Sequence, residues 1–177
     1  MRKSAKTALG GIISALSLTV MLLSALIPNL TYVLPMIAGA VIMIMVEEIG
    51  KGWSFLAYIT VSILSFMIIP DKEVAMMYAA FFGYYPIVKR IFELKLKKAP
   101  AYICKFLVFN ISIAAAYLLI IKVFLIPVEG LGDFGVWTVP VLAVLGNLTF
   151  FIYDRLLTKM MAIYNGKVRK RFKGMFK

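Results

Sequence analysis

Six long apolar runs follow one another along this 177-residue chain, each bounded by proline, glycine or charged residues. An apolar helix of about 20 residues is long enough to cross the ~30 Å hydrocarbon core of a bilayer. The runs are continuously apolar, whereas the strands of a membrane barrel alternate in hydrophobicity over about ten residues. The sequence therefore predicts an all-α integral membrane protein with six transmembrane helices and short loops, at roughly residues 7–27, 30–46, 53–70, 74–89, 101–126 and 135–161.

The composition argues against a water-soluble enzyme and against most metal sites. Hydrophobic residues make up 63% of the chain and charged residues 16%, which is too little charge to cover a soluble domain. The chain has no histidine, which removes histidine-ligated metals and histidine-assisted nucleophiles. Its one cysteine, Cys104, cannot form an internal disulfide and is expected to be a small apolar residue in a helix. We therefore expect no cofactor, no metal and no enzymatic activity.

The distribution of charge predicts the orientation, because Lys and Arg in short loops stay on the cytoplasmic side. With the N-terminus inside, that side holds all of the 20 Lys and Arg except Lys72 and Lys122. An even number of spans then places both termini in the cytoplasm. We expect the protein to lie in the plasma membrane and to come from a bacterium. The basic start precedes an apolar run of full spanning length, so we expect a retained helix instead of a cleaved signal.

The chain divides into a six-helix transmembrane domain, residues 1–165, and a basic cytoplasmic tail, residues 166–177. Attraction to anionic lipids explains the tail, at about 1 kcal/mol per cation near the membrane surface. Nucleic acid is not an expected partner, because no soluble fold accompanies these cations. The one long polar connection, residues 89–100, is expected on the same side as the tail.

One pair of acidic motifs is similar to those of intramembrane aspartyl proteases. Gly130-Leu131-Gly132-Asp133 spells the GxGD signature, and Asp154 would supply the second carboxylate. The two acids are separated by about 21 residues of one helix, or roughly 31 Å, whereas a catalytic dyad shares a proton at contact distance. We therefore expect Asp154 to form an ion pair with Arg155 at the inner end of the sixth span.

A second acidic pair, Glu47 and Glu48, resembles part of the motif of CAAX-type membrane proteases, but the histidines of that family are missing. The pair is expected to be structural and to face cations such as Lys51 or those of the 89–100 connection. A small membrane-embedded enzyme is the least favoured alternative, and this acidic pair is its only support.

Polar residues inside apolar runs are costly and mark candidate sites. Asn110 and Asn147 lie near the middle of the last two spans, where a hydrogen bond between helices and a ligand contact are equally expected. A small planar ligand from outside would be held between the outer halves of these spans by stacking and a few hydrogen bonds. The candidate ligand-binding residues are Lys122, Glu129, Trp137, Asn147 and Tyr78. The alternative is an ordinary outer interface, with Trp137 as an anchor and a snorkelling Lys122.

The first apolar run carries small residues at four-residue spacing, Thr7, Gly11 and Ala15, which lets another helix approach closely. Together with the basic start, the six short-looped spans and both ends inside, this resembles a substrate-binding S component of an energy-coupling factor (ECF) transporter. The resemblance implies capture of a vitamin-like micronutrient from outside. It also implies association with a membrane T component and two cytoplasmic ATPases, with the three small residues as the contact for a partner helix.

An alternative from another class is a scaffold subunit that transports nothing, similar to the cell-shape protein MreD. Such a protein has a similar size and number of spans. It would need no outward pocket and would use its small-residue face for assembly alone.

Overall fold

The computed structural model describes residues 3–27, 30–124 and 138–169, and this part of the chain consists of helices and turns without a strand. The all-α fold class predicted from the sequence is confirmed for these residues. In chain order the elements are α1 (Lys3–Leu22), the 3₁₀ turn η1 (Leu23–Ala25), α2 (Val33–Glu48), α3 (Lys51–Ile68), α4 (Lys72–Met77), the π-helical turn η3 (Tyr78–Phe82), α5 (Tyr85–Lys95), α6 (Lys98–Phe124), α7 (Thr138–Ile163) and the π-helical turn η6 (Tyr164–Val168).

Four helical stretches of the described chain are long and apolar enough to cross a membrane. They belong to the first, third, fifth and sixth predicted spans and cover Lys3–Ala25, Lys51–Ile68, Lys98–Ala116 and Pro140–Gly166. The second predicted span, α2, is apolar but has only 16 residues. The fourth is divided among α4, η3 and α5.

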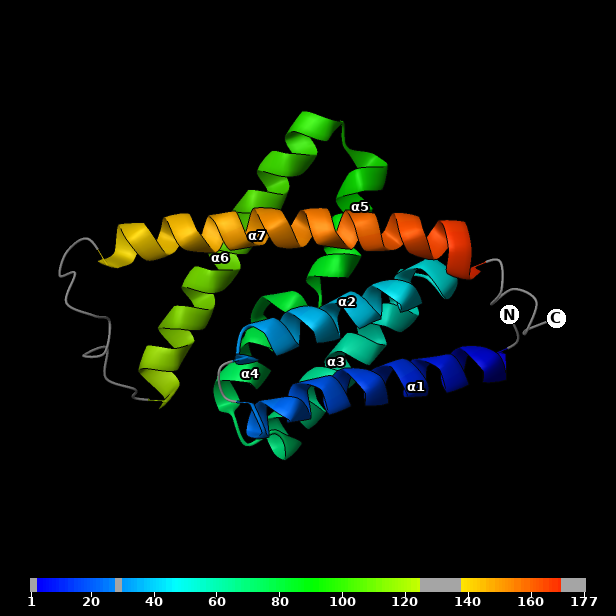
Figure 1. The fold of residues 1–177 in the computed structure, drawn as a ribbon, viewed down its shortest axis with the longest axis horizontal. Helices are drawn as coiled ribbons and strands as arrows, with labels where there is room; N and C mark the ends of the chain where they lie inside the picture. The colour runs from blue at the N-terminus through cyan, green and yellow to red at the C-terminus, as the bar shows by residue number, and fades with distance from the viewer. Residues whose placement is uncertain (1–2, 28–29, 125–137, 170–177) are drawn as a thin grey trace.

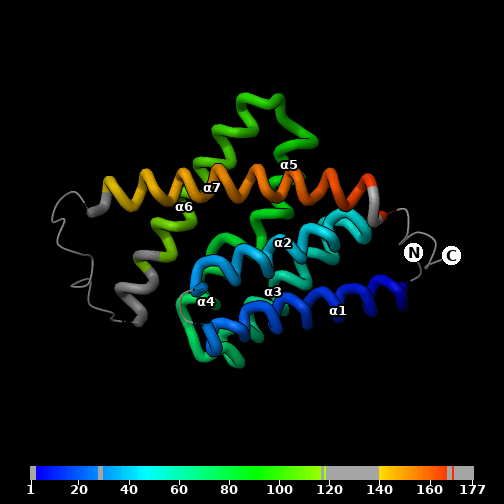
Figure 2. The backbone as a smooth tube through the Cα atoms, in the orientation of Figure 1, coloured from blue at the N-terminus to red at the C-terminus, as the bar shows by residue number. Residues whose placement is uncertain are grey.

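Helix α2 is the central element of the fold. Figure 1 shows it between α1 and α7, and it contacts α1, α3, η3, α5 and α7. Half of its 16 residues are buried, and Ala38 and Ile42 have no exposed surface at all. The tube in Figure 2 shows α1, α2 and α3 running back and forth beside one another. The helices on either side are therefore positioned by α2.

Small residues let α1 approach α2 closely. Gly10 is buried, and a Cβ placed on it would lie 3.2 Å from Met45 Cε. About two turns further along α1, the buried Ser17 hydroxyl donates a hydrogen bond of 3.2 Å to the Ala38 carbonyl oxygen. The contact face of α1 toward α2 therefore runs through Gly10, Ile13 and Ser17, beside the stripe of Thr7, Gly11 and Ala15.

A second close approach joins α2 to the π-helical turn η3. A Cβ on Gly39 would lie 2.1 Å from the carbonyl oxygen of Phe82, which is backbone and cannot rotate away. The hydroxyl of Tyr153 on α7 meets the same region, because it donates a hydrogen bond of 3.2 Å to Met36 on α2. Gly39 is therefore required by packing, at the point where α2 meets η3 and α7.

The fourth predicted span is not one continuous helix. A wide π-helical turn follows α4, and a short turn at Gly83 and Tyr84 then leads into α5. Pro86 lies in the first turn of α5, where the missing N–H costs nothing because that position has no helical acceptor. The sequence predicted a single helix at 74–89, whereas the structure divides this segment among α4, η3 and α5 and continues α5 to Lys95.

Local chemistry explains the turn between α3 and α4. Asp71 is the N-cap of α4 and accepts hydrogen bonds from the backbone N–H groups of Glu73 and Val74. Lys72 bends back and donates to the Phe66 and Ile69 carbonyl oxygens at the end of α3.

The polar connection predicted at 89–100 is much shorter than expected. Helix α5 continues to Lys95 and α6 begins at Lys98, so only Leu96 and Lys97 join them. Lys89, which the prediction placed in solvent, has no exposed surface. A charged residue ends an apolar run in the sequence, but it does not end a helix when neighbouring helices supply opposite charges.

Replacing Gly39 with Ala is expected to destabilise the protein by about 1–3 kcal/mol, the usual cost of overpacking, because the new methyl group meets the Phe82 carbonyl. Thermal unfolding in detergent, followed by circular dichroism, measures the effect. The matched control is Gly11→Ala, since a Cβ there meets nothing within 4 Å. Equal stability of the two variants would contradict the close contact of α2 with η3.

Candidate functional site

The structure describes only part of the predicted ligand-binding set. Glu129 and Trp137 lie outside the described residues, and so does the side chain of Lys122, which is on α6. Asn147 is on α7, at its contact with α6, and Tyr78 is the first residue of η3. Asn147 and Tyr78 lie in different parts of the described structure.

Asn110 and Asn147 bind each other. The Asn110 Nδ2 donates to Asn147 Oδ1 at 2.9 Å, and the Asn147 Nδ2 donates to Asn110 Oδ1 at 3.0 Å. The Asn110 Nδ2 also donates to the Phe106 carbonyl oxygen of its own helix, and the Asn147 Nδ2 donates to that of Ala143, both at 2.8 Å. Every amide hydrogen therefore has an acceptor, and the geometry favours the contact between helices over the ligand contact that the sequence left equally open.

Tyr78 is fully buried and packs beside Tyr58 of α3, with ring centroids 6.2 Å apart. Its hydroxyl has no hydrogen-bond partner among the described residues. Gly83 leaves room for both rings, because a Cβ there would lie 2.7 Å from each of them. Tyr78 is part of the apolar core formed with α1, α2 and α3, whereas Asn147 is half-buried where α7 meets α6.

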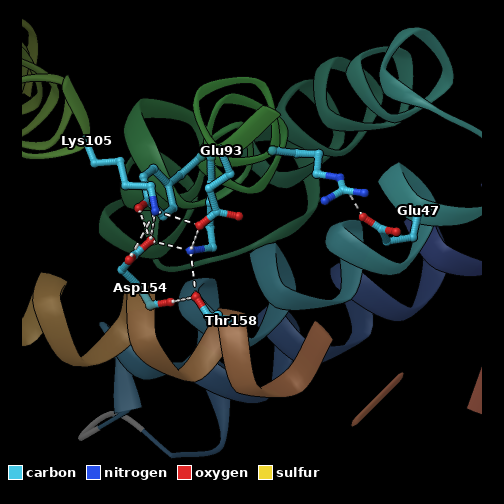
Figure 3. A network of polar contacts seen from close by, with 8 residues as sticks. Glu47, Glu93, Lys105, Asp154 and Thr158 are labelled. Atoms are coloured by element: carbon cyan, nitrogen blue, oxygen red, sulfur yellow. Dashed lines mark hydrogen bonds and ion pairs between the residues drawn. The ribbon is translucent and has the colours of Figure 1, made fainter. Parts of the chain in front are cut away.

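Four charged side chains meet in the interior where α5, α6 and α7 pack together (Figure 3). Lys89 Nζ lies 2.6 Å from Glu93 Oε1 and 2.6 Å from Asp154 Oδ1. Lys105 Nζ lies 2.7 Å from the same Glu93 oxygen and 3.2 Å from the same Asp154 oxygen. The two cations and two carboxylates alternate, so each charge touches two of opposite sign. We call these four residues the charge network.

Two hydroxyl groups complete the charge network. Tyr85 on α5 donates a hydrogen bond of 2.5 Å to Asp154 Oδ1. Thr158 accepts from Lys89 Nζ at 2.9 Å and donates to the Asp154 carbonyl oxygen, also at 2.9 Å, one turn earlier on α7. The ring of Tyr85 also packs against Phe150 at 5.3 Å, which places apolar surface beside the charges.

The side chains of the charge network are almost closed to solvent: Lys89 is 0% exposed, Lys105 and Asp154 3%, and only Glu93 reaches 30%. Burying a charge is expensive unless it is paired, and removing one partner leaves the other uncompensated. The balance of two positive and two negative groups meets this condition. The network therefore determines how α5, α6 and α7 are placed against one another.

The charge network was not predicted from the sequence, and the expected ion pair between Asp154 and Arg155 is wrong. Arg155 does not pair with Asp154, because successive residues on a helix point about 100° apart and do not face each other. Its guanidinium instead lies over the rings of Tyr102, at 5.9 Å, and Phe151, at 5.1 Å. The signal was present in the sequence, since Lys105 and Asp154 are ionisable residues inside apolar runs.

Glu47 and Glu48 form ion pairs, as the sequence analysis expected, though not with Lys51. Glu47 Oε1 lies 2.9 Å from Arg90 Nε, a cation of the predicted 89–100 connection. Glu48 Oε1 lies 3.1 Å from Arg169 Nε, which follows η6. The end of α2 is thereby joined to both α5 and the segment after α7.

The opposite end of α2 is joined to the start of α4. Tyr32 donates a hydrogen bond of 2.7 Å to Glu73 Oε1, and Thr31 donates one of 3.3 Å to Asp71 Oδ2. These two hydrogen bonds hold the turn before α2 against the N-terminal end of α4.

The small-residue stripe on α1 is left open by the fold. Thr7, Gly11 and Ala15 are all exposed, and a Cβ on Gly11 would meet nothing within 4 Å. Among the described residues no other helix covers this face, whereas the neighbouring face with Gly10 and Ser17 is buried against α2.

The described residues contain no group of three His, Cys, Asp or Glu side chains that would hold a metal ion. The GxGD motif at residues 130–133 lies outside them. Comparison with protein-family models, curated proteins and solved structures finds no match.

Asp154→Ala is expected to lower the stability by about 3–5 kcal/mol, because it leaves Lys89 and Lys105 with one shared carboxylate in a buried setting. Thermal unfolding in detergent measures this change. Arg155→Ala serves as the control, since it removes an exposed charge from the next position and is expected to cost less than about 1 kcal/mol. Similar losses in both variants would show that the charge network is not a stabilising contact.

The amide pair is expected to behave as one unit. Asn110→Leu alone leaves the Asn147 amide without its hydrogen bonds to the neighbouring helix, and Asn147→Leu alone does the same to the Asn110 amide. The double variant should therefore cost less than the sum of the two single changes, with a coupling of about 0.6–1.7 kcal/mol. A double-variant cycle of unfolding free energies tests this, and additive effects would contradict the pairing.

Proposed function

We propose that this protein is the substrate-capture subunit of an ECF-type transporter in a bacterial plasma membrane. It would take up a vitamin-like micronutrient and be energised by a T component and two cytoplasmic ATPases. The observation that carries the proposal is the open stripe of Thr7, Gly11 and Ala15 on the first helix, next to the basic start of the chain. A small-residue face that no described part of the fold covers is suited to the close approach of a partner helix.

The proposed topology has six spans with both termini in the cytoplasm. It is supported by the contacts at the two ends of α2. Glu47 and Glu48 at its C-terminal end pair with Arg90 and Arg169, which places the end of α7 on that side. Tyr32 before its N-terminal end binds Glu73 at the start of α4 on the other side. In Figure 1 the N-terminal end of α1 and the C-terminal end of α7 lie at the same side of the fold.

Cysteine labelling tests the topology. In a background with Cys104 replaced by Ser, cysteine at Lys97 is expected to react only from the cytoplasmic side of a sealed membrane. Cysteine at Leu26, which is 77% exposed at the other end of the fold, is expected to react only from outside. Labelling of both positions from the same side would contradict six spans with this orientation.

Gly11→Leu is expected to prevent the partner from binding while the protein still folds, because a leucine on this open face meets lipid instead of another part of the chain. Co-purification of the T component and ATPases from the native membrane is the measurement. Gly52→Leu on α3 is the matched control, since a Cβ there also meets nothing within 4 Å. Unchanged co-purification with Gly11→Leu would remove the stripe as a partner contact.

A scaffold subunit similar to MreD is the second candidate, and the amide pair favours it. Asn110 and Asn147 satisfy each other, as helix assembly requires, and offer no free amide to a ligand. Under the transport proposal, ligand binding then depends on Lys122, Glu129 and Trp137. Native mass spectrometry of the protein purified from its own membrane separates the two. A retained small molecule or an ATPase complex supports transport, and assembly without either supports the scaffold.

A further inference from the structure

A cavity of about 490 Å³ lies where the end of α2, the start of α3, α5 and the segment after α7 meet. Its size is within the range of small-molecule pockets. It is lined by one carboxylate and three cations, together with two apolar residues and a glycine, namely Val46, Glu47, Gly50, Lys51, Arg90, Leu94 and Arg169. This excess of positive charge favours an anionic ligand.

The acids of this region lie beneath the cations. Glu47 is 4% exposed and Glu48, which does not line the cavity, is 11% exposed. Their partners are more open, since Arg90 is 32% exposed and Arg169 35%. An incoming molecule therefore meets the guanidinium groups first, and the carboxylates are already paired with them.

The cations retain hydrogen-bonding capacity. Arg90 contacts Glu47 through Nε, and among the described residues nothing accepts from its two terminal Nη groups. Lys51 is exposed and makes no ion pair within the described chain. Arg169 has less remaining hydrogen-bonding capacity, because its Nη1 donates to Asn165 and its Nη2 donates to the Glu47 carbonyl oxygen. Arg90 and Lys51 are thus the groups available to an anion.

The backbone adds to the positive field. Gly50, at φ 96°, makes the turn from α2 to α3 in a region of conformational space that favours glycine. The first hydrogen bond of α3 runs from Ser54 N–H to the Gly50 carbonyl, so the three N–H groups before it have no acceptor in the helix. The positive end of the α3 dipole therefore coincides with Lys51 on the wall of the cavity.

We propose that this cavity binds a phosphate group carried on a larger molecule, with Lys51 and Arg90 as its principal contacts. Guanidinium groups suit phosphate because they donate parallel hydrogen bonds, and Lys supplies a further point charge. Phosphate of this kind has two sources at this end of the fold, the headgroup of an anionic phospholipid or a soluble phosphorylated compound. The inference does not depend on the transport function, and the site is separate from the outer residues expected to bind a micronutrient.

The test uses the full-length protein in a neutral detergent. Native mass spectrometry measures retention of phosphatidylglycerol against phosphatidylcholine with the same acyl chains, and a thermal shift measures binding of soluble glycerol 3-phosphate. Lys51→Gln is expected to reduce binding of the true ligand about fivefold, the effect of losing one cation near the surface. Lys95→Gln, an exposed cation on α5 outside the cavity, is the matched control and is expected to change nothing.

A second variant, Arg90→Lys, keeps a positive charge opposite the buried Glu47 and removes the planar fork, so it is also expected to weaken binding. Selective loss of phosphatidylglycerol in Lys51→Gln assigns the site to lipid, and selective loss of the glycerol 3-phosphate shift assigns it to a soluble compound. Equal effects of Lys51→Gln and Lys95→Gln, or binding of neither probe by the unaltered protein, would overturn the proposal.

Discussion

The pairing of buried charges is the constraint on which the second half of this fold depends. Lys89 and Lys105 lie among apolar helices, and each is held by both Glu93 and Asp154. An unpaired charge in this position would cost more than any single apolar contact returns. The observed arrangement of α5, α6 and α7 satisfies all four groups, and aromatic rings pack beside them.

The first half of the fold depends on close backbone contact instead. Gly10 and Ser17 bring α1 against α2, and Gly39 brings α2 against the π-helical turn. Apolar side chains gain little by leaving lipid for another helix, so in the proposed membrane setting small residues and tight packing are what hold helices together. The two halves of the fold meet at α2, which is contacted by the Phe82 carbonyl of η3 and by the Tyr153 hydroxyl of α7.

The helical class of this architecture was readable from the sequence, and the errors have two causes. The apolar runs indicated an all-helical chain, and the acids at the end of α2 and the contact between Asn110 and Asn147 were predicted as interactions between elements. Reading each charge as the end of an apolar run hid the continuation of α5 to Lys95 and the burial of Lys89. Partners far apart in the sequence, such as Lys105 and Asp154, are brought together by helix packing, which no local pattern encodes.

The position of Glu93 has a consequence for how the chain is made. Lys89 and Glu93 are one turn apart on the same helix, so this helix can enter an apolar environment with its own charges already paired. Lys105 follows on α6 and finds the same Glu93 oxygen, some fifty residues before Asp154 is synthesised on α7. The pairs of Glu93 with both lysines thus involve α5 and α6 alone, and the carboxylate that completes the balance comes from α7, the last long helix of the described chain.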